Sequence, residues 1–249
     1  METVYLSYGG GVNSTALMLL LKEWGINFEA VFVDHGGDFP ETYEYVNYIQ
    51  DQGFPITILK PQIEGYSDLY QYCLDKGLIP SRRFRWCTDK FKMRPMHKYF
   101  KRPAQVYMGI DWEERHRIKE FDAIYTPKGI TYFYPLYEEN YTRQDCKSLI
   151  KEKGLKVPIK SCCFFCFNQR KSQIRKMYSE HRELYDKVRA LEMANKRDRR
   201  SILLKPFEYY APEGTLSLLE YMDKRPQEVE ITYEVIKRPR IQTIQKRIQ

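Results

Sequence analysis

A run of glycines near the start of the sequence constrains the fold of this chain more than any other feature. Residues 4–6 favour a short β-strand, and three consecutive glycines follow at residues 9–11. A helical pattern of apolar residues then begins at Asn13 or Ser14, both of which suit a helix N-cap. A strand, a glycine turn and a capped helix together direct backbone N–H groups towards an anion. Glycine is needed there because a Cβ would keep a phosphate away from the backbone.

The composition is that of a folded protein. A chain of 249 residues can form one large α/β domain with a small appendage. Its 43% hydrophobic and 15% aromatic content favours a packed core over disorder. No apolar run reaches the roughly 18 residues that a membrane span requires, and no signal-peptide pattern is present. We therefore expect a cytoplasmic protein with no membrane partner.

The formal net charge of +8 allows an acidic partner such as a nucleic acid, although many proteins of this charge bind none. Residues 237–247 are basic and contain no acidic residue. This stretch is either a solvated tail or a contact for a phosphate backbone.

Two β–α units within the first 60 residues predict a doubly wound, mostly parallel sheet. Residues 28–34 form an apolar strand that ends in Asp34, and residues 56–59 form a third strand. Ligands of such sheets bind at the carboxyl ends of the strands, where the glycine turn and Asp34 would both lie. Asp34 there either bonds a ribose hydroxyl or caps the end of its strand.

The glycine turn resembles the PP-loop of the adenine-nucleotide α-hydrolase group, usually written Ser-Gly-Gly-x-Asp-Ser. Gly9 stands in place of the serine and Asn13 in place of the aspartate. Residues 31–43 resemble the Asp-Thr-Gly…Phe-Pro-Glu-Thr-Tyr signature of phosphoadenylylsulfate reductases and their relatives, with His35 in place of the threonine. The resemblance implies an α/β fold of three layers, like that of other PP-loop proteins, and a bound adenine nucleotide, ATP with Mg²⁺.

Two later segments are similar to the same family. Residues 82–95 are rich in basic residues around Cys87 and resemble its Arg-x-Cys-(Cys/Thr)-x-x-x-Lys-x-x-Pro segment. Positive charge there would hold a phosphate or sulfate and lower the pKa of the thiol. A solvated basic helix face is the alternative. Residues 109–117 resemble the family's Gly-x-Arg…Glu-Ser…Arg stretch, with Asp111 in place of the first arginine.

The chain has six cysteines, which in a reducing compartment are not expected to form structural disulfides. Cys73 stands alone in a helical pattern and is interpreted as an ordinary buried thiol. Cys163 and Cys166 form a Cys-x-x-Cys loop before a long amphipathic helix predicted over residues 172–192. Ligation by thiolates alone selects an iron–sulfur cluster or Zn²⁺, while Cys-x-x-Cys also serves redox dithiols.

The family resemblance favours the cluster. Adenylylsulfate reductases hold a [4Fe–4S] cluster with a Cys-Cys pair and a later Cys-x-x-Cys, and here Cys87 precedes Cys163 by 76 positions. The resemblance therefore implies ligation by Cys87, Cys163 and Cys166, with Zn²⁺ as the alternative. We select Cys146 as the fourth ligand because the first turn of its predicted helix stabilises a thiolate. Cys162 is the alternative fourth ligand.

One catalytic cysteine of the reductases has no counterpart in this sequence, and this difference changes the expected chemistry. They use a nucleophile in a Glu-Cys-Gly-x-His motif, whereas no cysteine follows Cys166 here. We therefore predict an ATP pyrophosphatase that splits ATP between its α and β phosphates, adenylates an acceptor and lets a sulfur nucleophile displace AMP. The cysteine arrangement resembles the ATP-pyrophosphatase component of DNA phosphorothioation systems, which implies a nucleic-acid acceptor and a sulfur donor protein.

Two alternatives stay open: a phosphoadenylylsulfate or adenylylsulfate reductase, and a nucleotide-binding regulatory module without turnover. Asn13 favours the module because it removes a carboxylate that would help to position Mg²⁺.

Residues 1–140 are predicted as the PP-loop nucleotide-binding domain and residues 141–249 as a helical, cysteine-containing region packed on it. The predicted catalytic residues are Asn13, Ser14 and Asp34. The predicted nucleotide-binding residues are Ser7, Gly9, Gly10, Gly11, Asn13, Ser14, Asp34, Lys90, Arg94 and Gly109. The predicted metal ligands are Cys87, Cys146, Cys163 and Cys166.

Overall fold

The computed structural model describes residues 2–80, 85–118, 126–169 and 171–194. The chain divides into a compact unit of residues 1–203 and a second of residues 204–249, and all described residues belong to the first. The basic stretch at residues 237–247 lies outside the described residues, as do residues 82–84 of the basic segment. The predicted domain boundary at residue 140 stays a prediction.

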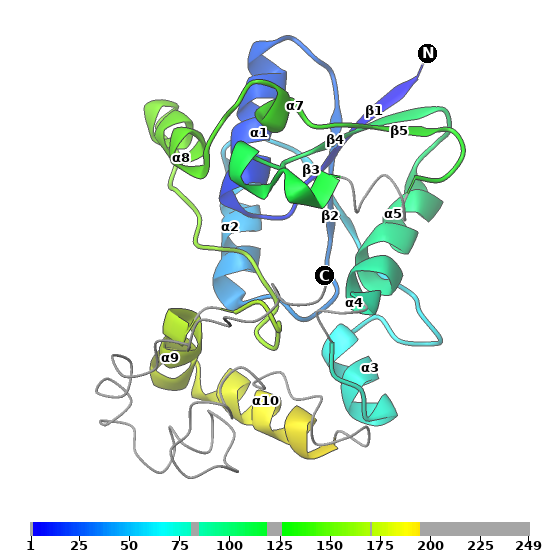
Figure 1. The fold of residues 1–249 in the computed structure, drawn as a ribbon, viewed down its shortest axis with the longest axis vertical. Coiled ribbons are helices and arrows are strands. Elements are labelled where there is room, and N and C mark those ends of the chain that lie inside the picture. Colours follow the sequence, from blue (N-terminus) through cyan, green and yellow to red (C-terminus); the bar gives the residue numbers. More distant parts are fainter. Residues whose placement is uncertain (1, 81–84, 119–125, 170, 195–249) are drawn as a thin grey trace, which may run out of the picture. The chain divides into compact units, whose positions relative to one another are not determined.

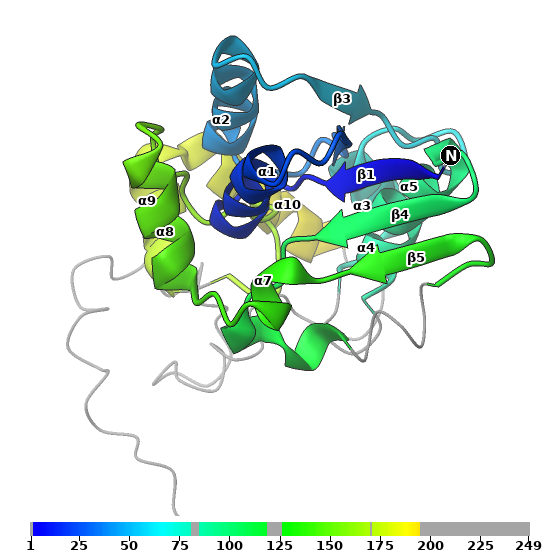
Figure 2. The same ribbon diagram turned by 90° about the horizontal axis from the view of Figure 1, so that it is seen from above.

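Five strands form one parallel sheet in the order β3-β2-β1-β4-β5 (Figure 1). This confirms the predicted α/β fold with a doubly wound sheet. The chain moves outward from β1 to β3 on one side and from β4 to β5 on the other, so the direction of winding changes between β1 and β4. Figure 2 shows β1, β4 and β5 side by side and running the same way. The strands are β1 (Thr3–Ser7), β2 (Glu29–Val33), β3 (Ile56–Leu59), β4 (Ala104–Met108) and β5 (Ile130–Phe133).

Alternating side chains of the strands contribute to two separate cores. Leu6 and Phe32 pack with α1 (Val12–Glu23), α2 (Pro40–Asp51) and α8 (Arg143–Glu152). The adjacent Tyr5 and Val31 pack on the other face with η1 (Asp89–Met93) and α5 (Arg94–Tyr99). The period of two is that of a sheet covered on both faces.

The helices are α1 (Val12–Glu23), α2 (Pro40–Asp51), α3 (Leu69–Lys76), α4 (Trp86–Thr88), the π-helix η1 (Asp89–Met93), α5 (Arg94–Tyr99), the 3₁₀ helix η2 (Trp112–Glu114), α7 (Pro135–Glu138), α8 (Arg143–Glu152), α9 (Lys171–Glu180) and α10 (Arg182–Ala194). Across the described residues, every helix falls short of the length and apolar character that crossing a membrane requires.

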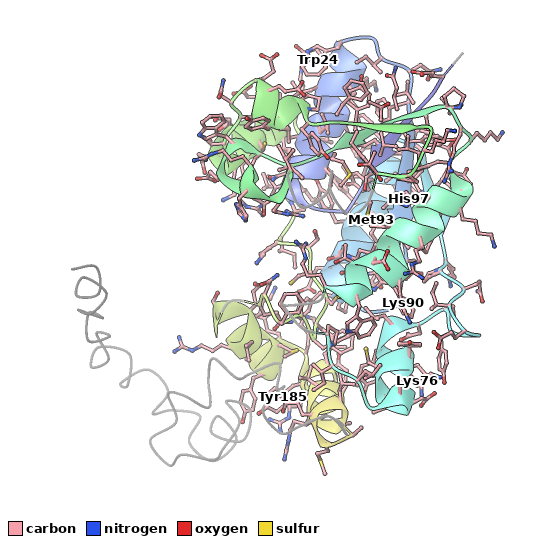
Figure 3. All side chains as sticks on the ribbon, turned by 45° about the vertical axis from the view of Figure 1, so that its right-hand side comes forward. Trp24, Lys76, Lys90, Met93, His97 and Tyr185 are labelled. Carbon is pink, nitrogen blue, oxygen red and sulfur yellow. The ribbon has the colours of Figure 1, made fainter. Side chains whose placement is uncertain are left out.

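The single long helix predicted over residues 172–192 is wrong, because two helices, α9 and α10, occupy this segment with His181 between them. Lys176 Nζ and His181 Nε2 lie 2.9 and 3.0 Å from the same oxygen, Oε1 of Glu41 at the start of α2. After His181, α10 packs against α3, and its Tyr185 is fully buried (Figure 3). The helical segment is interrupted at His181, and its two parts have different partners: α9 is bound to Glu41 through Lys176, and α10 packs on α3.

The carboxylate of Glu41 makes this junction sensitive to acid. Burial alone would raise its pKa, but the hydrogen bonds from Lys176 and His181 outweigh burial and lower the pKa to about 2. The ionised group therefore stabilises the fold above the ordinary pKa of a glutamate, and this stabilisation is lost as the pH falls from about 4.5 towards 2. Because solvent reaches part of this carboxylate and screens its ion pairs, we expect Glu41→Gln to lower the free energy of unfolding at pH 7 by on the order of 1 kcal/mol.

Urea unfolding followed by circular dichroism at pH 7 and pH 3 measures this effect. Glu180→Gln is the matched control, since the exposed Glu180 bonds the same Lys176 at 3.5 Å and should contribute less than about 0.5 kcal/mol. Equal stability losses in the two variants at pH 7 would contradict the assignment.

Candidate functional site

The glycine turn of residues 9–11 joins β1 to α1 at the carboxyl edge of the sheet. Gly10 has a φ of +64°, and a Cβ there would lie 2.9 Å from Cγ2 of Thr42 on α2. Glycine is therefore required at this position both by the backbone conformation and by the space available. Gly109 approaches the turn from the end of β4, where a Cβ would lie 2.8 Å from the backbone N of Ser14. The turn is thus held between α2 and the end of β4.

The N-cap of α1 is Gly11, so the prediction of Asn13 or Ser14 at this position is wrong. Both residues lie in the first turn of the helix instead. Ser14 Oγ accepts the backbone N–H groups of Gly9 at 3.2 Å and of Gly11 at 3.3 Å. The serine hydroxyl therefore closes the turn from inside the helix, and the first N–H groups of α1 have no side-chain cap.

Asn13 and Asp111, which both depart from the PP-loop family pattern, contact each other. Asn13 Nδ2 donates a hydrogen bond to Asp111 Oδ2 at 2.8 Å, and both side chains are buried. Asp111 Oδ1 also accepts the N–H of Glu114 at 2.8 Å, which caps η2. Arg143 Nη1 lies 3.4 Å from Asn13 Oδ1. A carboxylate thus stands beside the turn, carried by residue 111 instead of residue 13.

Asp34 follows β2 at the same edge of the sheet. Its Oδ1 accepts the N–H of Gly36 at 3.1 Å, which is the cap that the sequence left open as an alternative to a ribose contact. Lys60 Nζ lies 3.9 Å from Asp34 Oδ2. At the end of β1, Ser7 Oγ lies 3.6 Å from Sδ of Met96.

Lys90 and Arg94, predicted to hold a phosphate, have acidic partners in the structure. Lys90 and Lys76, both labelled in Figure 3, form ion pairs with Glu64 at 3.2 and 3.6 Å. Arg94 Nη2 lies 2.6 Å from Asp89 Oδ2. A phosphate would have to compete with these carboxylates.

The cysteine loop, defined as residues 157–167, lies against the glycine turn. A Cβ at Gly11 would lie 2.7 Å from Oγ of Ser161. Asp38, which follows β2, forms an isolated antiparallel bridge with Cys163. Two segments about 150 positions apart in the sequence therefore meet at the carboxyl ends of β1 and β2.

Two predicted metal ligands, Cys163 and Cys166, lie in this loop, and a third, Cys87, lies on α4 close enough to interact with them. The thiols of Cys87, Cys163 and Cys166 act electrostatically on one another, and burial is the main cause that raises the pKa of each. The expectation that basic residues lower the pKa of Cys87 is wrong, because burial outweighs the opposing effect of Lys92. Burial would lower the pKa of Lys92 itself, but Asp38 and the three thiols reverse this and raise it. Lys92, which the sequence did not single out, is thus a cation that acts on all three thiols, and Lys160 also acts on that of Cys166.

Cys146 and Cys162 occupy different environments. Cys146 is fully buried in the apolar core that α1 and α8 share, and Asp111 is the charged group that acts most strongly on its thiol. The thiol of Cys162 instead interacts with that of Cys166. Cys162, the alternative fourth ligand, therefore has a thiol as a neighbour. The charged groups described as acting on the thiol of Cys146 are Asp111, Asp145 and Arg143. Cys73 is a fully buried free thiol on α3, and its thiol interacts with that of Cys87, a neighbour that the sequence did not indicate.

The described residues contain two sets of three side chains that could each hold a metal ion. Within each set, the possible ligand atoms lie within 4.8 Å of one another. The sets are His35 with Asp38 and Cys163, and Glu41 with Glu180 and His181. The first set lies in the cysteine loop region, and sequence analysis assigned neither His35 nor Asp38 to a site. Burial lowers the pKa of His35 to about 4, so its ring is neutral at pH 7.

A family model and several known proteins match parts of this chain. The model of the phosphoadenosine phosphosulfate reductase domain matches residues 3–158. Two uncharacterized proteins of Methanocaldococcus jannaschii are 29% and 30% identical over 44% and 39% of this chain, and these matches span 25% and 20% of their own lengths. An uncharacterized 37.8 kDa protein of Escherichia phage 186 is 24% identical over 70% of both chains. A solved phosphoadenylyl-sulfate reductase from Candida auris, in a phosphate complex, has a TM-score of 0.46 and 16% identity over 64% of this chain and 76% of that one.

The contact between Asn13 and Asp111 yields a prediction for stability. Asn13→Asp would place two carboxylates within hydrogen-bond distance in a buried site, which costs about 2–4 kcal/mol unless one of them is protonated. Adding Asp111→Asn to the same chain should recover most of this loss, because an amide and a carboxylate again face each other with exchanged roles. Urea unfolding at pH 7 measures both variants. A single Asn13→Asp variant as stable as the wild type would contradict the proposed pairing.

Proposed function

The chain belongs to the phosphoadenosine phosphosulfate reductase domain family, a family of nucleotide-using enzymes, and from that premise we propose that it is an ATP pyrophosphatase that activates an acceptor for sulfur transfer. One observation carries the proposal: the cysteine loop lies against the glycine turn, with Ser161 next to Gly11. The turn binds the phosphates of ATP, so the reacting phosphorus lies on the same edge of the sheet as the thiols.

The nucleotide is bound by the turn and by the residues around it. The phosphates lie over residues 9–14, and Asp34, at the end of β2, faces the ribose. The carboxylate of Asp111, 2.8 Å from Asn13, takes over the role of the aspartate that Asn13 replaces and helps to position Mg²⁺. A carboxylate at this place weakens the main argument for a regulatory module without turnover.

The reaction has two steps. An oxygen of the acceptor attacks the α-phosphorus of ATP, and the bond to the bridging α–β oxygen breaks, so that pyrophosphate leaves with the electron pair. The adenylyl group then leaves as AMP when a sulfur nucleophile from a donor protein attacks the activated acceptor. The net charge of +8 supports a nucleic acid as the acceptor. Reactive thiols require a reducing compartment such as the cytoplasm.

The thiols fit a thiolate-ligated metal centre, for which we propose a [4Fe–4S] cluster with Zn²⁺ as the alternative. Cys87, Cys163 and Cys166 are the first three ligands, and Cys162 replaces Cys146 as the fourth because its thiol interacts with that of Cys166. When bound, such a cluster supplies electron-transfer and sulfur-binding chemistry. Lys92 keeps a positive charge beside the thiolates and thereby favours their ionised form.

The metal content of cysteine variants tests the ligand set. We expect anaerobically purified protein to contain iron and to absorb broadly in the visible region, and Cys87→Ala, Cys162→Ala, Cys163→Ala and Cys166→Ala to lose both properties. Cys146→Ala is the matched control and should retain its iron. Loss of iron in Cys146→Ala with retention in Cys162→Ala would return Cys146 to the ligand set, and a colourless protein loaded with zinc would exclude the cluster.

The products formed from ATP test the reaction. We expect pyrophosphate when ATP, Mg²⁺ and an oligonucleotide acceptor are supplied, and AMP in an equal amount once a sulfur donor is added, as measured by ion-exchange chromatography. Sulfite released from phosphoadenylylsulfate or adenylylsulfate would instead identify a reductase, the activity that the family's name favours as the second candidate. Tight ATP binding without any product would identify a regulatory module.

Gly9→Ala separates a role in binding from a role in folding. A Cβ at Gly9 meets no atom within 4 Å, so thermal stability should not change. The same Cβ would point into the space where the phosphates are proposed to lie, and we expect ATP to bind about tenfold more weakly, which is a loss of about 1.4 kcal/mol. Calorimetric titration with ATP and Mg²⁺ measures the affinity. An unchanged affinity would contradict the placement of the phosphates.

A further inference from the structure

His35 is fully buried after β2, at the position where the family signature has a threonine. Its Nδ1 accepts the backbone N–H of Gly37 at 3.1 Å. A backbone N–H can only donate, so Nδ1 carries no proton, and the single proton of the ring lies on Nε2. A Cβ at Gly37 would lie 3.1 Å from this same Nδ1, so the lack of a side chain at Gly37 permits the close approach that fixes the tautomer.

The protonated Nε2 faces two acceptors. It lies 3.4 Å from Asp38 Oδ2 and 3.8 Å from Cys163 Sγ. These three atoms form one of the two close sets of possible metal ligands in the described residues. A ring nitrogen that carries a proton cannot bind a metal, however, so the tautomer excludes His35 from the ligand set and makes it a hydrogen-bond donor to the sulfur.

We propose that His35 is a positioning residue, which holds Cys163 through an Nε2–H···S hydrogen bond and shares its proton with Asp38, and which thereby adjusts the reduction potential of the metal centre without binding metal. Hydrogen bonds to the sulfur ligands are among the features that set the potential of iron–sulfur clusters. The hydrogen bond itself is independent of the proposed function. The effect on the potential rests on the proposed function, because it requires the cluster.

The tautomer can be measured with or without metal. The chain has four histidines, so a long-range ¹H–¹⁵N correlation spectrum of protein labelled at histidine is simple, and His35→Gln identifies the signals of His35. We expect an unprotonated Nδ1 and a protonated Nε2 in both the metal-free and the metal-loaded protein. A proton on Nδ1 would leave no donor to face Cys163, and loss of the Nε2 proton when Zn²⁺ is added to the metal-free protein would make His35 a ligand; either result would overturn the proposal.

The effect on the metal centre is measured by redox titration of anaerobically purified protein. His35→Leu has a similar volume and no donor, and we expect its midpoint potential to move to a more negative value, because the sulfur loses a hydrogen bond that offsets its charge. His35→Gln keeps an N–H donor and should stay closer to the wild type. Equal potentials in the wild type and His35→Leu would overturn the proposal, as would loss of iron from both variants at unchanged stability.

The two proposals fail in different ways. A wild-type protein that binds neither iron nor zinc would contradict the proposed function, while the histidine spectrum would still decide whether His35 donates to Cys163. A wild-type protein with a cluster whose potential does not respond to His35→Leu would contradict only the role of His35.

Discussion

The contact between the cysteine loop and the glycine turn is the constraint on which the rest of the site depends. Ser161 can lie next to Gly11 only because residue 11 has no side chain, and the bridge between Asp38 and Cys163 fixes the same loop to the end of β2. In a parallel sheet the carboxyl ends of neighbouring strands meet at one edge, so residues distant in sequence reach a common site without a long connection. The proximity of the glycine turn and the cysteine loop follows from these contacts, and the proposed reaction depends on it.

Electrostatic balance explains why two departures from the family pattern occur together. An amide at residue 13 and a carboxylate at residue 111 form one buried hydrogen bond, whereas two carboxylates at this distance would repel each other. The negative charge beside the turn is therefore moved to the end of β4. Considered alone, Asn13 suggested the loss of a carboxylate that positions a metal. The structure places another carboxylate beside it, since Asp111 Oδ2 lies 2.8 Å from Asn13 Nδ2.

The periodic parts of the fold could be predicted from the sequence, whereas side-chain direction at the site could not. Apolar runs at residues 28–34 and 56–59 indicated the parallel sheet because strands covered on both faces are apolar throughout. Lys92 was not distinguished from Lys90 and Arg94, since the π-helix η1 changes the direction in which successive side chains point and no local pattern signals it. Cys146 was assigned to the metal site from its place in the first turn of a helix, but tertiary packing against α1 put it in the core. The break at His181 likewise depends on Glu41, a residue 140 positions away.

In the proposed function, nucleotide phosphates and a thiolate-bound metal occupy neighbouring places on the same edge of the sheet. The most direct measurement is an anaerobic crystal structure with a non-hydrolysable ATP analogue and Mg²⁺, recorded with data at the iron absorption edge. We expect phosphate density over residues 9–14 and an anomalous iron peak bounded by Cys87, Cys163 and Cys166. An iron peak away from these cysteines, or a nucleotide bound elsewhere than at the glycine turn, would contradict it.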